Sequence, residues 1–326
     1  MQKDLLPFER EHRDILIKKE ATTDQNFGCD PNKRTVEKLI SYGVVNLNKP
    51  QGPTSHQISD YVQKILGVAK AGHSGTLDPN VTGCLPIALD KATRIVQTLL
   101  IAGKEYVGVM HLHKEVTKDE IESVFKNFLG KINQIPPRKS AVKRQMRERE
   151  IYYFNILEIE DKDILFKIGC QAGTYIRKIC DDFGKKLGTG AHMAELIRTK
   201  AGPFKIEESF TLHDLNDAYS LLKNENKEKE IRRIILPIEK GVEHLNKIWV
   251  TDKTVNNLCH GADLFSPGVS KLHKNIDKNE LVAIMTLKEE LICLAETELN
   301  SEEILKKEKG LIAKTKKVFM ERNIYT

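Results

Sequence analysis

The chain has 326 residues, of which 40% are hydrophobic and 30% are charged, and its formal net charge at pH 7 is +6. This length predicts about two domains with packed cores, so we expect a soluble globular protein. The basic residues are bunched instead of evenly spread, which points to polyanionic partners, with nucleic acid as the first candidate.

Cysteine usage and the N-terminal sequence indicate the cellular compartment. The six cysteines form no Cys-x-x-Cys pair and no metal-ligand spacing with the ten histidines. We therefore expect free thiols in a reducing cytoplasm and no bound metal. Charges recur every few residues after the first methionine, which excludes a signal peptide or a membrane span there.

The first third of the chain shows strand and helix patterns after a charged start. Residues 1–35 are weakly periodic, so they form either a mobile tail or an extension that docks elsewhere. An apolar strand from residue 43 runs into a KPQGP turn, and apolar residues at helical spacing follow Thr54 or Ser55 as the N-cap. Further predicted elements are a buried strand over 85–89, an amphipathic helix over 92–100 and a strand over 104–112.

The middle of the chain predicts a helix followed by a β-hairpin. A capping box beginning at Thr117 starts the helix, whose apolar face extends to Phe128 before a natural stop at Gly130. Two β-rich runs, over 149–160 and 164–170, surround a short charged turn. This pattern is typical of a hairpin.

A second helix is predicted from about Tyr175 to Gly188. Its apolar face consists of Ile176, Ile179, Cys180, Phe183 and Leu187. Arg177 falls off this face, so we expect its side chain to face a cleft instead of the core.

The C-terminal third changes in composition. Residues 215–240 are polar and charged, as in a solvated helix or a connection between units. Short β-like runs with tight turns then predict a small β-barrel. The expected organisation is an N-terminal extension over 1–35, an α+β domain with a mixed sheet and flanking helices over 36–244, and the barrel over 245–322.

Residues 72–83 read GHSGTLDPNVTG and frame one carboxylate, that of Asp78, with backbone-shaping residues. Three glycines permit positive φ or close backbone approach, and Pro79 pushes Asp78 away from helical geometry. An Asp-Pro turn between glycines is, by itself, most often an ordinary surface turn. The stiffness of the whole string makes Asp78 our candidate catalytic residue.

Other side chains could support Asp78 or replace it as the catalytic group. Desolvation in a closed pocket disfavours a charged carboxylate, so a fixed cation is needed nearby, and Arg177 is the candidate. Without the other motifs, Arg177 is more readily a surface charge on a helix. A hydrolase with Ser74 or His73 as nucleophile is the alternative, but the chain lacks a Gly-x-Ser-x-Gly elbow.

The strongest basic patch lies between the predicted helix and hairpin. Six basic residues occur within twelve positions and are opposed by Glu148 alone: Arg138, Lys139, Lys143, Arg144, Arg147 and Arg149. A charge run is usually a solvated face. One this unbalanced favours contact with a phosphate backbone.

Several stretches resemble, in order and spacing, motifs of the pseudouridine synthases of the bacterial tRNA T-loop enzyme and eukaryotic dyskerin superfamily. They are GVVNLNKPQGPTSH at 43–56, GHSGTLDPNVTG at 72–83, KEYV at 104–107 and GTYIR at 173–177. Dyskerin-like stretches are PPRKSAVKR at 136–144, HMAEL at 192–196 and a C-terminal segment similar to a PUA domain. Because it has no long lysine-rich tail, the chain is most similar to the archaeal catalytic subunits of box H/ACA ribonucleoproteins.

The resemblance implies roles for individual residues. Asp78 corresponds to the nucleophile, Arg177 to its ion-pair partner and Tyr106 to the aromatic residue that stacks on the target base. Taken alone, Tyr106 is more readily a core residue. The implied substrate-binding set is His73, Tyr175, Leu196, Lys49, Arg138, Lys139, Lys143 and Arg144. Within it, the motif that contains Lys49 supports the catalytic loop in the family and performs no chemistry.

The implied reaction breaks the N1 glycosidic bond of uridine, rotates the uracil and joins its C5 to the ribose, without a cofactor. Asp78 suits attack on C6, attack on C1′ or removal of a ribose proton, and the sequence leaves these routes open. Implied substrates are uridine 55 in the T loop of tRNA and guide-directed sites in rRNA. Implied partners are tRNA, box H/ACA guide RNA, rRNA and small accessory proteins, with no membrane. The alternative is a noncatalytic RNA-binding scaffold, which does not require Asp78, Tyr106 and Arg177 together.

Overall fold

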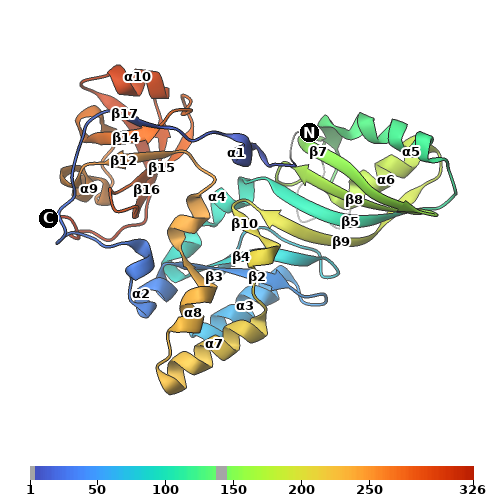
Figure 1. Ribbon diagram of the computed structural model, residues 1–326, viewed down its shortest axis with the longest axis horizontal. Coiled ribbons are helices and arrows are strands. Elements are labelled where there is room, and N and C mark those ends of the chain that lie inside the picture. Colours follow the sequence, from blue (N-terminus) through green and yellow to red (C-terminus); the bar gives the residue numbers. More distant parts are fainter. Residues whose placement is uncertain (1–3, 137–144) are drawn as a thin grey trace.

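The computed structural model describes residues 4–136 and 145–326. A ten-stranded sheet forms the larger part and a seven-stranded sheet the smaller part, which lies to one side of it (Figure 1). No helix of the described residues is long and apolar enough to cross a lipid bilayer.

The larger sheet is mixed and has the order β11-β2-β4-β9-β5-β8-β7-β6, with β3 on β4 and β10 on β9. Its strands are β2 (Gly43–Lys49), β3 (Ala71–His73), β4 (Thr82–Leu89), β5 (Lys104–Leu112), β6 (Gly130–Gln134), β7 (Arg147–Glu160), β8 (Asp163–Cys170), β9 (Ala191–Ala201), β10 (Phe204–Lys205) and β11 (Ile235–Pro237). The predicted strand over 104–112 and the predicted hairpin, β7 and β8, are confirmed.

The parallel pairing of β4 with β9 joins two halves of this sheet. Thr82 pairs with Ile197 and Gly83 with Arg198. Gly83 has φ +105°, and a Cβ placed on it would lie 2.3 Å from the carbonyl oxygen of Arg198. Glycine at this position therefore allows the two strands to approach closely. We call this contact the sheet junction.

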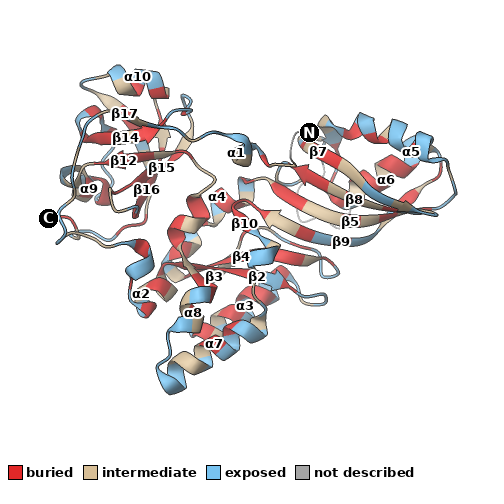
Figure 2. Ribbon diagram, viewed as in Figure 1, coloured by how far each residue is buried: buried red, intermediate tan, exposed pale blue. Residues whose placement is uncertain are grey.

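Helices cover the half of the sheet that contains β2 and β4. They are α2 (Val36–Ser41), α3 (Ser55–Leu66), α7 (Leu212–Glu225) and α8 (Lys229–Ile234). Their apolar residues share one core with the strands, while their outer faces are exposed (Figure 2). Thr54, one of the two predicted N-cap candidates, is the N-cap of α3, and its hydroxyl accepts the N–H of Gln57.

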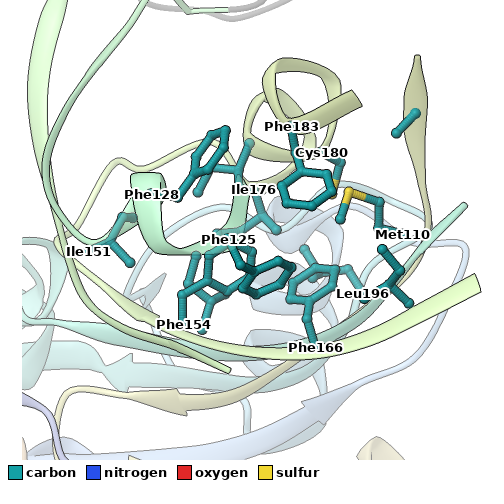
Figure 3. Close-up of a cluster of buried hydrophobic side chains, with 14 of the residues drawn as sticks. Met110, Phe125, Phe128, Ile151, Phe154, Phe166, Ile176, Cys180, Phe183 and Leu196 are labelled. Atoms are coloured by element: carbon teal, nitrogen blue, oxygen red, sulfur yellow. The ribbon is translucent and has the colours of Figure 1, made fainter. Parts of the chain in front are cut away.

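Helices α5 (Lys118–Phe125) and α6 (Ile176–Leu187) pack on the other half of the sheet. Figure 3 shows that phenylalanines from both helices and from β7 and β8 meet in one buried cluster. The ring of Phe125 lies 3.9 Å from that of Phe154 and 5.1 Å from that of Phe183, centroid to centroid. Because α6 is anchored there through the predicted apolar face, its first turn is fixed in position.

Two predicted helices are shorter than expected. The helix predicted over 92–100 is divided into a 3-10 helix, η2 (Asp90–Ile95), and α4 (Val96–Ile101). Threonine hydroxyls bond to nearby carbonyls in both elements and compete with regular helix bonding. Helix α5 ends at Phe125 and continues as η3 (Lys126–Phe128), which still buries Phe128 against Phe183.

The smaller sheet has its own apolar core. Its strands are β12 (Lys247–Val250), β13 (Leu264–Phe265), β14 (Val269–His273), β15 (Leu281–Met285), β16 (Leu291–Thr297), β17 (Leu311–Val318) and the edge strand β1 (Ile15–Ile17). The other elements of the described residues are α1 (Pro7–Arg10), α9 (Asp252–Cys259), α10 (Ser301–Lys306), η1 (Pro31–Lys33), η4 (Ile206–Glu208), η5 (Ile238–Val242) and η6 (Ser266–Gly268).

The N-terminal extension docks onto both sheets, which decides between the two expectations for it. Strand β1 pairs with β14 of the smaller sheet, and Leu6 is fully buried against the larger one. The carboxylate of Glu9 accepts a hydrogen bond from Lys200 Nζ at 2.9 Å. In Figure 1 this dark-blue segment crosses from one sheet to the other.

Candidate active site

Residues 74–81, which we call the Asp78 loop, connect β3 to β4 at the sheet junction. The N–H of Gly52 donates to the carbonyl of Pro79 at 2.9 Å. The N–H of Leu77 donates to Ser55 Oγ at 2.9 Å, and Ser55 is fully buried. Because neighbouring elements bond its backbone, the loop presents Asp78 in a fixed place.

Lys49 also holds this loop. Its ammonium is fully buried and donates to the carbonyls of Pro50, Pro79 and Val81 at 2.9, 3.1 and 2.9 Å. Desolvation lowers the pKa of Lys49, with a further contribution from the charge of Arg198. The burial corrects the inclusion of Lys49 among substrate-binding residues: its charged group cannot reach RNA, and it anchors the loop.

The side chains of Asp78 and Arg177 meet across the two halves of the sheet. Arg177 extends from the first turn of α6, and its Nη2 forms an ion pair with Asp78 Oδ2. The side chains of Arg177 and Asp78 are 52% and 51% exposed, so the pair is open to solvent. The predicted cation therefore lies at the predicted carboxylate, where it can orient it.

A buried glutamine fixes the start of α6. The side-chain amide of Gln134, which is 3% exposed, donates to the carbonyl of Tyr175 at 3.2 Å and accepts the N–H of Tyr175 at 3.0 Å. This reciprocal pair fixes the backbone two residues before Arg177. Tyr175 itself is half-buried.

Strands β5 and β9 present Tyr106 and Leu196 on one face. Tyr106 is the register partner of Arg198, and Leu196 is the partner of Gly108, two positions along each strand. Tyr106 is half-buried, and Leu196 belongs to the apolar core. Burial raises the pKa of the Tyr106 phenol, while the charge of Arg198 acts in the opposite direction. Tyr106 is thus neutral and suited to stacking on a base.

His73 lies where the Asp78 loop begins. Its Nδ1 accepts the N–H of Gly75 at 3.3 Å, and its Nε2 lies 3.3 Å from Nδ1 of His56. Desolvation, followed by the charges of His56 and Arg198, lowers the pKa of His73 to about 4. The imidazole is therefore neutral at pH 7, so its interaction with RNA would be through stacking or hydrogen bonding.

Burial excludes Ser74 as the nucleophile of the hydrolase alternative. Ser74 is fully buried, and its N–H donates to the carbonyl of Pro86 at 3.0 Å. A nucleophilic hydroxyl must reach its substrate. Ser74 cannot do so.

The basic patch is described in part. Arg138, Lys139, Lys143 and Arg144 lie outside the described residues. Arg149 lies on β7 beside Gly173, where an added Cβ would lie 3.1 Å from Arg149 Nη2. Since Gly173 is two residues from Tyr175, the described end of the patch reaches the candidate site.

An open hollow of about 1120 Å³ lies elsewhere, between the N-terminal extension, β11 and the smaller sheet. Neither Asp78 nor its predicted companions line it. Its lining mixes both signs of charge, as with Lys33, Glu239 and Lys288. The candidate active site is the exposed surface around Asp78 instead, which a bound RNA would have to cover.

The sequence did not reveal the roles of Gln134 and Arg198, or the hydrogen bond between Ser55 and the Asp78 loop. Each acts through a contact with a residue distant in sequence, for which no local pattern gives a signal. The sequence marks Ser55 only as a possible helix cap.

Comparisons with known proteins agree with the site. Family models match for the TruB family pseudouridylate synthase N-terminal domain at residues 63–176, the tRNA pseudouridylate synthase B C-terminal domain at 177–243, the PUA domain at 246–319 and the DKCLD (NUC011) domain at 4–59. The probable tRNA pseudouridine synthase B of Methanopyrus kandleri is 52% identical, covering 98% of this chain and 94% of that protein. Its Pyrococcus furiosus counterpart is 53% identical, covering 96% and 93%.

Solved structures show the same relationship. The structure described as "Crystal Structure of a Cbf5-Nop10-Gar1 Complex" contains a chain with TM-score 0.94 and 52% identity, with 98% of each chain covered. A chain in "Structure of H/ACA RNP bound to a substrate RNA containing 2'-deoxyuridine" has TM-score 0.93 and 50% identity, with 99% of each covered. The predicted resemblance and the predicted α+β fold followed by a PUA domain are confirmed. The chain belongs to the TruB family of pseudouridylate synthases.

Proposed function

We propose that the chain isomerises uridine to pseudouridine in RNA, with Asp78 as the nucleophile and Arg177 as its ion-pair partner. The observation that carries this proposal is their ion pair, which joins α6 to the Asp78 loop that Lys49 and Ser55 hold in place. A noncatalytic scaffold would not require this contact.

The reaction needs one carboxylate and a site that keeps the detached uracil from escaping. The N1–C1′ bond breaks, the uracil turns, a C5–C1′ bond forms, and the hydrogen on C5 is replaced while N1 gains a proton. The carboxylate of Asp78 attacks C6 or C1′, or removes a ribose proton, and these three routes stay open. Tyr106 would stack on the uracil and keep it over Asp78 during the turn.

The exposure of the site indicates how substrate binds. The target base is inaccessible in a stacked helix, so it must be flipped into the site. Asp78 and Arg177 are each about half exposed, and RNA itself would then complete the enclosure. We assign the basic residues over 138–149 to the phosphate backbone beside the flipped nucleotide.

For substrates, we propose guide-directed uridines of rRNA within a box H/ACA particle, and uridine 55 of tRNA. Related chains occur in complexes named for Nop10 and Gar1 and in one with a substrate RNA. At about 50% identity over nearly the full length, this chain would assemble in the same way. We place it in the cytoplasm, which its six free cysteines support. The domain limits at 36–244 and 245–322 stay a prediction.

Two arms of one assay test the choice of substrate. An unmodified tRNA transcript is incubated with the chain alone, and a target RNA is incubated with chain, guide RNA, Nop10 and Gar1. Pseudouridine is mapped in both. Product in both arms supports both substrates, product in one arm restricts the proposal to that substrate, and product in neither contradicts it.

A further inference from the structure

Arg198 is a buried cation held without an acidic partner. Its side chain is 1% exposed, and no ion pair to it exists among residues 4–136 and 145–326. Buried arginines are normally paired with a carboxylate. Arg34 of this chain is an example, since it binds Glu239 through two contacts of 2.9 and 2.8 Å. The unusual environment of Arg198 calls for another explanation.

Backbone carbonyls on both sides of Asp78 bind the Arg198 guanidinium. Its Nε donates to the carbonyl of Cys84, in β4, at 2.7 Å. Its Nη1 and Nη2 approach the carbonyl of Gly75, three residues before Asp78, at 3.4 and 3.3 Å. One planar group thus spans the start of the loop and the strand that follows it.

The same residue lies beside the proposed stacking aromatic. A β-bulge in the pairing of β5 with β9 makes Tyr106 the register partner of Arg198. Arg198 is also the residue that Gly83 contacts at the sheet junction. Arg198, on β9, therefore contacts the Asp78 loop, which leads into β4 in one half of the sheet. It also neighbours Tyr106, which lies on β5 in the other half.

We propose that Arg198 is a positioning residue for uridine isomerisation: its guanidinium sets the Asp78 loop relative to Tyr106. The inference rests on the proposed function, because it assigns Asp78 and Tyr106 to the reaction. A guanidinium suits this task because its N–H donors have a fixed planar arrangement and can bind two carbonyls at once. Arg198 cannot contact substrate, because it is buried.

Lys104 offers a control for the loss of a buried amino group bound to backbone carbonyls, and burial followed by the charge of Arg198 lowers its pKa to about 7. It is 5% exposed and donates to the carbonyls of Leu99, Leu100 and Ala102 at 2.9, 2.8 and 2.7 Å. All three carbonyls belong to the end of α4 and the turn after it, and none of them belongs to the Asp78 loop. Lys104→Met therefore removes a buried, carbonyl-bound amino group without removing a hydrogen bond to the Asp78 loop.

The experiment compares wild type, Arg198→Met, Arg198→Lys and Lys104→Met in the assembled particle with guide RNA. Single-turnover rate, target-RNA affinity and thermal melting are measured on each, with rates taken below every melting transition. Displacement of reacting groups by about 1 Å reduces rates by about 100-fold. We expect a loss of that order in Arg198→Met with RNA affinity retained, and a smaller loss in Arg198→Lys, whose ammonium reaches fewer acceptors.

The control separates positioning from folding. Lys104→Met is expected to lower the melting temperature while its rate stays near wild type. Equal rates in Arg198→Met and Lys104→Met would overturn the inference. If Arg198→Met does not fold, Arg198→Lys decides: a slower rate at unchanged melting temperature supports positioning, and a wild-type rate overturns it. Absence of product from wild type would instead contradict the proposed function itself.

Discussion

Replacing Gly83 with alanine tests the sheet junction. Gly83 has φ +105°, a region that costs a residue with a side chain about 1–3 kcal/mol. The new Cβ would also lie 2.3 Å from the carbonyl oxygen and 2.8 Å from the nitrogen of Arg198. Both atoms belong to the backbone of β9, so the strands must separate, and such overpacking adds about 1–3 kcal/mol. The expected loss of unfolding free energy is roughly 4 kcal/mol, the sum of the two contributions.

Gly52→Ala is the matched control. Gly52 has φ +111°, and no described atom lies within 4 Å of its Cβ position. Its substitution should cost the conformational part alone, about 1–3 kcal/mol. Denaturant unfolding followed by circular dichroism gives both values. Equal losses in the two variants would refute the argument that close approach of β4 and β9 requires glycine.

Three further predictions concern anchoring and pH. Lys49→Met leaves the buried carbonyl of Val81 without its donor, so the unfolding free energy should fall by about 1–3 kcal/mol and pseudouridine formation should slow; a wild-type rate would contradict the anchoring role. Burial lowers the pKa of His244 and of His273 from 6.5 to about 4. Their neutral forms therefore stabilise the fold fully above about pH 6.5, and this contribution is lost as the pH falls towards 4, with a limiting slope of about 1.4 kcal/mol per pH unit for each histidine. Denaturation series between about pH 7 and 4 check this, and replacing either histidine with glutamine should flatten the profile. Leu6→Ala removes a fully buried side chain and should weaken docking of the N-terminal extension by about 2–5 kcal/mol; limited proteolysis would detect its release, and an unchanged cleavage rate would contradict the docking.

Features set by local sequence could be predicted. The capping box at Thr117, the strand over 104–112 and the apolar face of α6 depend on neighbouring residues, and the structure has all three. The apolar face also predicted that Arg177 lies off the core side of α6, and the residue is exposed.

Features that depend on contacts between residues far apart in the sequence could not be predicted. The sheet junction joins Gly83 to Arg198 across more than a hundred residues, and no periodicity reports such a pairing. Lys49 was grouped with the substrate-binding residues through the family resemblance, and its complete burial depends on contacts with Pro79 and Val81 that the local sequence does not indicate. Docking of the N-terminal extension depends on pairing with β14, a strand that lies far along the chain, so the charged sequence of the extension left two possibilities open.

The measurement that tests the central claim most directly compares wild type with Asp78→Asn in the guide-loaded particle. The substitution keeps size and shape but removes the carboxylate that pairs with Arg177. The expected result is pseudouridine from wild type, no product from Asp78→Asn, and similar RNA binding by both. Equal turnover by the two proteins would contradict the assignment of Asp78 as the catalytic residue.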